Sequence, residues 1–267
     1  MEGVKRNSET NLEERVRKLA QWMFKAKYLI VFTGAGISTE SGIPDFRGPV
    51  GLWTRFDPDD FTIDKFLANP DSRRKQWYIF REGLLSDKAM PNAAHFAVAE
   101  LYRMGRLDCI ITQNIDNLHQ KAGVPDEKVF ELHGNMKWAI CLDCGRRFPF
   151  EEIKSRLDSG DEIPDCRACH GTLKPDIVMF GEQLPYKVLE EAGRRSRAAD
   201  LFIVIGSTLV VYPAAYMPAY AVASGAKLVI INIGDTPMDR EATVLIDAKA
   251  GDTMAAIVNS VKEKSSP

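Results

Sequence analysis

Five short runs of apolar residues recur along this chain, and each is followed at once by glycine or polar side chains. Continuous apolar runs of this length are typical of strands buried on both faces of a parallel sheet. Helical patterns alternate with the runs, which predicts an α/β fold. The runs are residues 28–33, 109–112, 129–132, 201–205 and 228–233, with 243–247 as a candidate sixth. The helical patterns lie near residues 93–104, 186–199, 213–223 and 252–263.

A further helical pattern lies near the start of the chain. Apolar side chains recur at steps of four and three from Leu12 to Ala26, which predicts one buried helix face. Thr10 and Glu13 have the spacing of a capping box, so we expect the helix to begin just after Thr10.

Two segments interrupt the alternation of strands and helices. Residues 49–91 are rich in aromatic and charged side chains, and residues 137–175 hold four of the five cysteines. We expect both to be insertions that together form a smaller module. The sheet domain is then made of residues 1–48, 92–136 and 176–267.

The charge balance argues against a protein held to nucleic acid by a basic surface. Lys and Arg number 35 and Asp and Glu number 37, which leaves a net charge of −2, whereas phosphate binding needs clustered positive charge. No stretch reaches about 18 apolar residues, the length that indicates a membrane-spanning helix. The first residues also lack the apolar core of a signal peptide. We therefore expect a cytoplasmic protein with no membrane contact and no direct binding of nucleic acid.

The first apolar run ends in Gly34-Ala35-Gly36, a pattern that opens many dinucleotide sites. Glycines at such a turn allow backbone N–H groups to approach a pyrophosphate. The dehydrogenase fingerprint needs a third glycine three residues later, where this chain has Thr39. The loop therefore predicts a phosphate cradle but is a poor match to hydride-transfer enzymes. A tight turn with no ligand is the alternative.

Amide and carboxylate side chains follow the second apolar run. Gln113, Asn114 and Asp116 come directly after residues 109–112. Because ligands bind at the carboxyl ends of strands in open α/β sheets, these groups are suited to a ribose or a carboxamide. The alternative is that Asp116 and Asn117 only cap the next helix.

His133 follows the third apolar run and precedes a glycine. A histidine at a strand end can reach into a cleft and act as a general base near neutral pH. The chain has four histidines, and for any one of them the alternative is a buried structural role.

The cysteines form two C-x-x-C pairs with 21 residues between them. Four thiolates presented by two tight turns predict a tetrahedral zinc site, and a full set of protein ligands makes the metal structural. His170 follows the second pair, which therefore also spells the c-type haem pattern, but the matching upstream pair favours zinc. The expected ligands are Cys141, Cys144, Cys166 and Cys169.

Seven motifs stand in a fixed order along the chain. They are GAGISTESGIPDFRG (34–48), TQNIDNLHQKAG (112–123), ELHGN (131–135), the two C-x-x-C pairs, KPDIVMFGE (174–182), GSTLVVYPAA (206–215) and VIINIGDTP (229–237). In this combination the chain resembles the sirtuin family of NAD-dependent protein deacylases over about residues 12–262. The resemblance implies a Rossmann-like parallel sheet domain with a smaller zinc-binding and helical module. NAD and an acyl-lysine peptide would meet between the two.

The resemblance also implies a set of binding residues. It puts Phe46 and Arg47 on a loop that covers NAD, and Ile115 and Asp116 at the nicotinamide carboxamide. The implied acyl-lysine channel is formed by Val178, Phe180, Gly181 and Glu182. The implied NAD contacts are Gly34, Ala35, Gly36, Thr39, Asp45, Phe46, Arg47, Gln113, Asn114, Ile115, Asp116, Gly206, Ser207, Thr208, Asn232, Ile233, Lys249 and Ala250.

The reaction that the resemblance implies consumes NAD. The acyl oxygen of the substrate lysine attacks C1′ of the nicotinamide ribose and nicotinamide leaves, a step in which alignment contributes much of the rate. His133 would be the catalytic base for a ribose hydroxyl, with Asn114 beside it as a catalytic residue. Water then completes the release of free lysine and O-acyl-ADP-ribose.

Tyr78 and Arg81 bear on which acyl group is removed. Family members that remove acidic acyl groups carry a Tyr-x-x-Arg pair in this region, where the arginine pairs with the distal carboxylate. The alternative is a helix with an aromatic core face and one exposed arginine. We favour that alternative, so we expect deacetylation over desuccinylation.

Three other functions compete with deacylation. Mono-ADP-ribosyl transfer would use the same NAD site, so the sequence leaves it open. A dehydrogenase would need the missing third glycine, and a non-enzymatic zinc module would not bind NAD at all.

Overall fold

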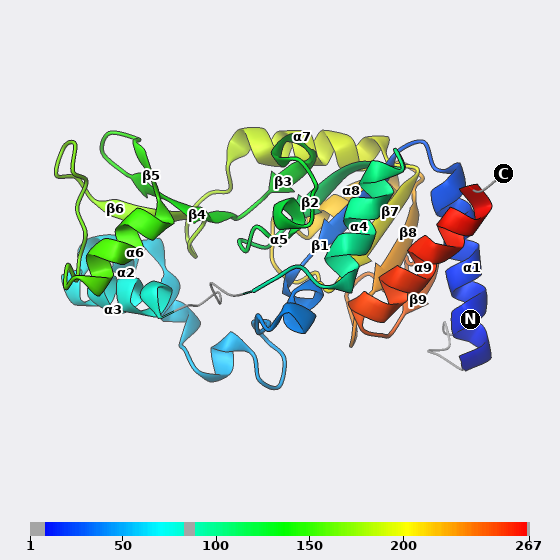
Figure 1. Cartoon of the computed structure of the whole chain (residues 1–267), viewed down its shortest axis with the longest axis horizontal. Coiled ribbons are helices and arrows are strands. Elements are labelled where there is room, and N and C mark those ends of the chain that lie inside the picture. Colours follow the sequence, from blue (N-terminus) through cyan, green and yellow to red (C-terminus); the bar gives the residue numbers. More distant parts are fainter. Residues whose placement is uncertain (1–8, 83–88, 266–267) are drawn as a thin grey trace.

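A six-stranded parallel sheet forms the centre of the larger part of the molecule (Figure 1). The computed structural model describes residues 9–82 and 89–265. The sheet contains all five expected strands and the candidate sixth, so this prediction is confirmed. The strands are β1 (Leu29–Thr33), β2 (Leu107–Thr112), β3 (Val129–Glu131), β7 (Leu201–Ile205), β8 (Lys227–Ile231) and β9 (Val244–Ile246).

The strand order places β1 in the middle of the sheet. The order is β3-β2-β1-β7-β8-β9, so the chain builds one half of the sheet outward from β1 and then returns beside β1 with β7. In doubly wound sheets of this order, ligands bind outside the carboxyl ends of the strands, where the direction of winding reverses. The loops that follow β1 and β7 therefore flank the expected binding crevice.

Helices cover both faces of this sheet (Figure 1). Successive β1 residues pack on opposite faces, with Val31 in one apolar cluster and Phe32 in the other, which explains why the strand sequences are continuously apolar. One face carries α1 (Glu9–Lys25), α4 (Ala93–Arg103) and α9 (Ala250–Ser265), and the other carries α7 (Tyr186–Ala198) and α8 (Tyr216–Ala223).

The first helix starts earlier than expected, and one short helix lies outside the expected helical ranges. Helix α1 begins at Glu9, so Thr10 lies inside the helix and the expected start after Thr10 is wrong. The short α5 (Leu118–Lys121) follows β2 and packs against α4.

No helix in the described part of the chain is long and apolar enough to cross a membrane.

Within the described residues, the smaller part of the molecule combines an antiparallel sheet with three helices (Figure 1). Its sheet has the order β5-β4-β6, and one apolar cluster joins it to the helices. The expected boundaries at 136/137 and 175/176 fall inside β4 and β6, so these two strands carry the chain between the two parts. The elements are α2 (Ile63–Ala68), α3 (Pro70–Arg81), β4 (Gly134–Cys141), β5 (Arg147–Pro149), α6 (Phe150–Asp158) and β6 (Leu173–Ile177).

Candidate active site

A cavity of about 580 Å³ lies at the carboxyl ends of the central strands. Its lining includes His133, all residues expected to contact NAD, and all four residues expected to line the acyl-lysine channel. Among the described residues, Tyr78, Arg81 and the four paired cysteines do not line it. Residues from widely separated stretches of the sequence are thus brought to one space.

The glycine loops after β1 and β7 touch through their backbones. The N–H of Gly36 donates to the carbonyl of Gly206 at 2.8 Å. A Cβ on Gly36 would lie 2.7 Å from the Gly206 Cα, and a Cβ on Gly206 would lie 2.3 Å from the Ile37 nitrogen. Gly206 also has a φ of 61°, which disfavours any residue with a side chain. Close approach of two loops therefore requires these glycines, whatever ligand they face.

No α-helix follows the first glycine loop. Two short 3₁₀ turns, Ala35–Ile37 and Thr39–Ser41, occupy that place. The Thr39 hydroxyl donates back to the carbonyl of Gly36 at 3.0 Å. The loop is therefore compact, and it differs from the dehydrogenase pattern in structure as well as in sequence.

Asn114 and Asp116 are linked by the Ser38 hydroxyl of the first glycine loop. The Asn114 amide donates to Ser38 Oγ at 3.1 Å, and Ser38 Oγ donates to one Asp116 carboxylate oxygen at 2.7 Å. The other Asp116 oxygen accepts the Leu118 N–H at 2.9 Å. Asp116 thus accepts the first N–H of α5, while Asn117, the N-cap residue, makes no side-chain capping hydrogen bond. Asp116 also lines the cavity.

The imidazole of His133 is fixed in one tautomer. Its Nδ1 lies 2.9 Å from the backbone carbonyl of Gln113, and because a carbonyl only accepts, Nδ1 carries the proton and Nε2 has a free lone pair. Burial lowers the pKa of His133 from its ordinary value of 6.5, and the hydrogen bond to Gln113 opposes that effect. The ring is therefore neutral near neutral pH and able to accept a proton at Nε2.

The Gln113 side chain crosses to the second glycine loop. Its amide donates to the Ser207 hydroxyl at 2.8 Å, while its backbone N–H donates to the Thr33 carbonyl at 3.0 Å. The residue that orients His133 is therefore itself held by both halves of the sheet.

Backbone carbonyls and Glu40 shape the end of the cavity near β8 and α9. The Asn232 amide is buried and donates to the carbonyls of Ile233 and Gly234, each at 3.1 Å. The first turn of α9 is held by Glu40, whose carboxylate accepts the Gly251 N–H at 2.8 Å. Lys249 and Ala250 line the cavity beside this turn.

Aromatic rings form an apolar wall of the cavity. Trp53 lies 5.2 Å from the ring of Phe46, 5.6 Å from that of Phe61 and 5.8 Å from that of Phe180, measured between centroids. The preceding loop is shaped by Asp45, whose carboxylate accepts the Gly48 N–H at 2.8 Å. An apolar wall of this kind is suited to the aliphatic stem and neutral acyl group of a modified lysine.

A buried ion pair shapes the segment from Val178 to Glu182. Lys174 is almost fully buried, and its ammonium group lies 2.9 Å from the Glu182 carboxylate. The same carboxylate oxygen accepts the Met179 N–H at 2.7 Å, and the Val178 N–H donates to the His133 carbonyl at 2.8 Å. Glu182 thus stabilises the local turn in addition to lining the cavity.

Tyr78 and Arg81 lie side by side on α3. The Arg81 guanidinium sits 4.9 Å from the centre of the Tyr78 ring and pairs with Glu82 at 2.8 Å. Tyr78 is 54% exposed, whereas Phe80 on the same helix is buried and lines the cavity. This is the arrangement of an aromatic helix face with an exposed edge.

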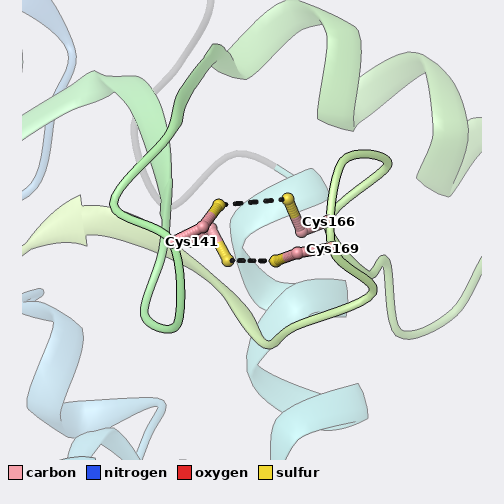
Figure 2. A group of neighbouring side chains, drawn as sticks. Cys141, Cys166 and Cys169 are labelled. Carbon is pink, nitrogen blue, oxygen red and sulfur yellow. Dashed lines mark hydrogen bonds between the residues drawn. The ribbon is translucent and has the colours of Figure 1, made fainter.

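The four paired cysteines converge in the smaller part of the molecule (Figure 2). All four sulfur atoms lie within 4.8 Å of one another, and two cross-pair distances are 3.5 and 3.7 Å. Sulfurs about 2.3 Å from a central zinc in a tetrahedron are separated by roughly 3.8 Å. Donor type and spacing therefore fit one structural zinc. Cys109 is buried in β2.

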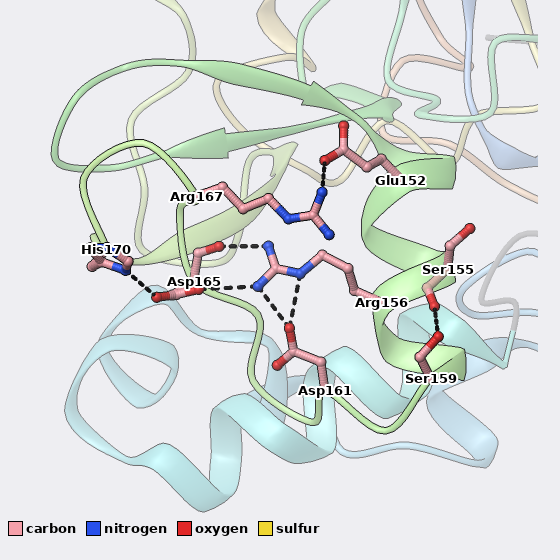
Figure 3. A network of polar contacts seen from close by, with 8 residues as sticks. All are labelled: Glu152, Ser155, Arg156, Ser159, Asp161, Asp165, Arg167 and His170. Carbon is pink, nitrogen blue, oxygen red and sulfur yellow. Dashed lines mark hydrogen bonds and ion pairs between the residues drawn. The ribbon is translucent and has the colours of Figure 1, made fainter.

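His170 is not part of this sulfur cluster. Its Nδ1 lies 3.0 Å from a carboxylate oxygen of Asp165 (Figure 3). Arg156 from α6 pairs with Asp165 at 3.1 Å and with Asp161 at 2.7 Å. These polar contacts tie the second cysteine turn to α6, so His170 has a structural partner and the haem pattern finds no support.

Comparison with known proteins decides the family. The sequence model of the Sir2 family matches residues 34–213, more than half of the chain. The chain belongs to the Sir2 family. The resemblance carried by the seven motifs is thereby confirmed, and the fold of this Sir2 protein is the α/β fold with the zinc-type cluster described above.

Similar proteins cover almost the whole of this Sir2 chain. The NAD-dependent protein deacylase 2 of Archaeoglobus fulgidus is 46% identical over 94% of this chain and 98% of its own. NAD-dependent protein deacetylase 1 of Bradyrhizobium diazoefficiens is 42% identical over 94% of this chain and 98% of its own. A solved structure of Sir2 with a p53 peptide and NAD⁺ is 40% identical, with a TM-score of 0.82 over 93% of this chain and 97% of that one.

Several residues of the Sir2 site could not be singled out from the sequence. Ser38 links the two polar loops, and Trp53 and Phe61 build the aromatic wall. The clustering of aromatic residues within a charged segment was the available signal for Trp53 and Phe61. The burial of Lys174 could not be predicted, because a lysine that precedes a proline gives no local sign of being buried.

Proposed function

We propose that this Sir2 protein is an NAD-dependent protein-lysine deacetylase that releases nicotinamide, O-acetyl-ADP-ribose and free lysine. The observation that carries the proposal is the position of His133. Its neutral imidazole lines one cavity together with the glycine loops and with the apolar segment from Val178 to Glu182. The names of the two relatives, a deacylase and a deacetylase, support the same chemistry.

Binding of NAD is assigned to the polar side of the cavity. The backbone N–H groups and small side chains around Gly34–Gly36 and Gly206–Thr208 suit phosphates, and Asn232 with Lys249 suits the adenosine. Asn114 and Asp116 line the cavity, and we assign them to the nicotinamide ribose and carboxamide, which need hydrogen-bond partners. NAD, when bound, supplies an activated sugar carbon and nicotinamide as leaving group.

The acyl-lysine is assigned to the aromatic side of the cavity. Acylation removes the lysine charge, so an apolar channel past Phe180 binds the acylated side chain without the cost of burying an ammonium group. Val178 and Gly181 offer backbone for pairing with an extended peptide. The partners are therefore acyl-lysine peptides and proteins.

The catalytic role is assigned to His133. With Nδ1–H committed to Gln113, Nε2 is the atom that accepts a proton from a ribose hydroxyl. Asn114 is the neighbouring polar group that aligns the ribose. Phe46 and Arg47, on the loop at the cavity edge, exclude water while the reaction proceeds.

The smaller part of the molecule is proposed to be a second domain held by zinc. It is formed by residues 49–91 and 137–175. Its apolar cluster contains two of the four clustered cysteines, Cys141 and Cys166, together with Phe61 of the aromatic cavity wall. Zinc at this cluster is structural because four thiolates fill a tetrahedral site. Among the described residues none of the five cysteines is in a disulfide, which supports a reducing compartment, and we propose the cytoplasm.

Acetyl-lysine is the proposed substrate because Arg81 of α3, the candidate partner for the carboxylate of an acidic acyl group, does not line the cavity. Arg81 is turned to Glu82 and Tyr78, and a succinyl carboxylate entering the apolar channel needs a cationic partner.

The test is to incubate the protein with NAD and matched peptides that differ only in carrying acetyl-lysine or succinyl-lysine. We expect nicotinamide release together with loss of the acetyl mass, and far slower turnover of the succinyl peptide. Radiolabelled NAD that tags protein without deacylated peptide would instead assign ADP-ribosyl transfer. Nicotinamide release equal with both peptides would overturn the acetyl preference, and formation of NADH would overturn the reaction class.

A further inference from the structure

Two buried histidines lie behind the cavity and belong to none of the roles assigned above. His95 in α4 is fully buried, and His119 in α5 is 2% exposed. Their ring centroids are 5.1 Å apart. Neither residue lines the cavity, so any effect on the reaction must pass through other residues.

His119 is hydrogen-bonded to a pair of buried threonines at the ends of β1 and β2. Thr33 and Thr112 are directly opposite one another in the parallel ladder, and Thr33 Oγ1 donates to Thr112 Oγ1 at 2.8 Å. His119 Nε2 lies 2.9 Å from Thr33 Oγ1. Since the single Thr33 hydroxyl proton goes to Thr112, His119 Nε2 carries a proton and donates it to Thr33.

The chain of hydrogen bonds continues into the cavity. Thr112 Oγ1 accepts the backbone N–H of Asn114 at 3.0 Å. The Asn114 amide then donates to Ser38, which donates to Asp116. Thus one continuous path leads from His119 through two hydroxyls to the backbone of Asn114 and on to the side chains proposed to meet the nicotinamide ribose.

His95 completes the path on its far side. Its Nδ1 accepts the Asn92 N–H at 3.4 Å, which leaves the proton on Nε2. Asn92 in turn donates to the Ile37 carbonyl at 2.7 Å and to Ser41 Oγ at 3.0 Å, both in the first glycine loop. Among the described residues, the donor His95 Nε2 and the acceptor His119 Nδ1 are buried with no hydrogen-bond partner. The two rings therefore contain one unused donor and one unused acceptor and contact each other by packing.

We propose that His119, backed by His95, is a positioning residue that sets Asn114 for NAD through Thr33 and Thr112. The inference rests on the proposed function only for the identity of the ligand at Asn114. Each hydrogen bond from His119 through Thr33 and Thr112 to the Asn114 N–H is buried and has a fixed donor and acceptor, which makes the path rigid. Burial keeps both rings neutral, because it lowers the pKa of each.

The test compares substitutions that keep or remove single hydrogen-bonding groups. Thr112→Val keeps the shape and removes the acceptor for the Asn114 N–H, whereas Thr112→Ser keeps the acceptor. His119→Phe removes the donor to Thr33, whereas His119→Gln offers an amide N–H at the reach of Nε2. Ser196→Ala is the matched control, because Ser196 is also a buried hydroxyl but bonds only within α7.

The readouts are the Kd for NAD by calorimetry, the KM for NAD and for acetyl-peptide, and the unfolding temperature. We expect Thr112→Val and His119→Phe each to raise the Kd and KM for NAD about tenfold, the effect of one lost hydrogen bond. The KM for peptide stays unchanged. The double variant is no worse than the worse single one, because both act on one path. Thr112→Ser, His119→Gln and Ser196→Ala bind NAD as the wild type does.

Other outcomes would separate the two proposals. Unchanged NAD affinity in Thr112→Val, or fully additive effects in the double variant, would overturn the positioning role even if stability falls. If His119→Phe does not fold, the comparison of Thr112→Val with Thr112→Ser tests the positioning role by itself. A wild type that binds NAD but does not deacetylate peptide would overturn the proposed function while leaving this test intact. A wild type that does not bind NAD overturns both.

Discussion

His133 donates from Nδ1 to the backbone carbonyl of Gln113 at 2.9 Å, and Gln113 is anchored to Ser207 across the sheet. The proposed general base is therefore oriented by a residue that is also bonded to the second glycine loop. We expect a movement of that loop to shift Gln113 and, with it, the His133 imidazole.

The substitution His133→Asn keeps the hydrogen bond that orients the side chain and removes the nitrogen that acts as the base. The Asn amide can still donate to the Gln113 carbonyl, but it offers no basic nitrogen in place of Nε2. We expect kcat for deacetylation to fall by on the order of 10²–10⁴, with NAD affinity and the unfolding temperature close to wild type. Initial rates of O-acetyl-ADP-ribose formation measure the effect. Turnover within a few-fold of wild type would remove His133 from the mechanism.

His95 makes folding stability depend on pH. Burial lowers its pKa from 6.5 to about 4, with a smaller opposing effect from Asp116. Between these values the unfolded chain binds the proton and the folded chain does not, so the contribution of His95 is complete above pH 6.5 and is lost as the pH falls toward 4. We expect His95→Gln, which suits the capping box with Asn92, to flatten this slope.

Urea unfolding at about pH 7 and about pH 5 measures that slope. The loss of stability between the two pH values should be smaller in His95→Gln than in wild type, by on the order of 2 kcal/mol. Protonation of the cysteine thiolates acts on both proteins and cancels in the comparison. An equal loss of unfolding free energy in the two proteins would show that folding does not lower the pKa of His95.

Removal of zinc should unfold the smaller part of the molecule and abolish activity with it. Cys141 and Cys166 are buried in the apolar cluster that also contains Phe61 and Met179, which line the cavity. We expect purified protein to contain one zinc per chain by elemental analysis, and Cys166→Ser to lack it. Cys109→Ala is the control, because Cys109 lies in the large sheet and its variant should keep the metal. Full activity in a zinc-free variant contradicts this prediction.

The contact between the glycine loops predicts unequal effects of two Gly→Ala substitutions with the same kind of backbone. Gly206 and Gly225 both have positive φ, but a Cβ on Gly225 meets nothing within 4 Å, whereas one on Gly206 collides with Ile37. We expect Gly225→Ala to cost roughly 1 kcal/mol and Gly206→Ala about 3 kcal/mol or more. Chemical denaturation measures both. NAD binding should be lost only in Gly206→Ala, and similar behaviour of the two variants would argue against the loop contact.

Local patterns in the sequence were sufficient for the strands of the large sheet, for the helices that cover it and for the cysteine cluster, whereas β4, β5, β6 and α6 of the smaller part were not predicted. A strand buried on both faces must be continuously apolar, so residues 201–205 could be placed as a strand directly. The spacing of Cys141 and Cys144 by itself puts two thiolates on one tight turn. Motifs such as ELHGN identified the family, and through it His133, without any knowledge of neighbours in space.

The sequence by itself therefore determined the strands of the large sheet, the approximate limits of the helices that cover it, the four cysteines that cluster and most of the residues that meet at the cavity. Only the tertiary structure decided how those residues are held. Gly36 meets Gly206, and His119 reaches Asn114 through Thr33, because the sheet places β1 beside both β7 and β2. Such contacts join residues far apart in the chain, and their energies depend on burial and geometry that no local pattern encodes.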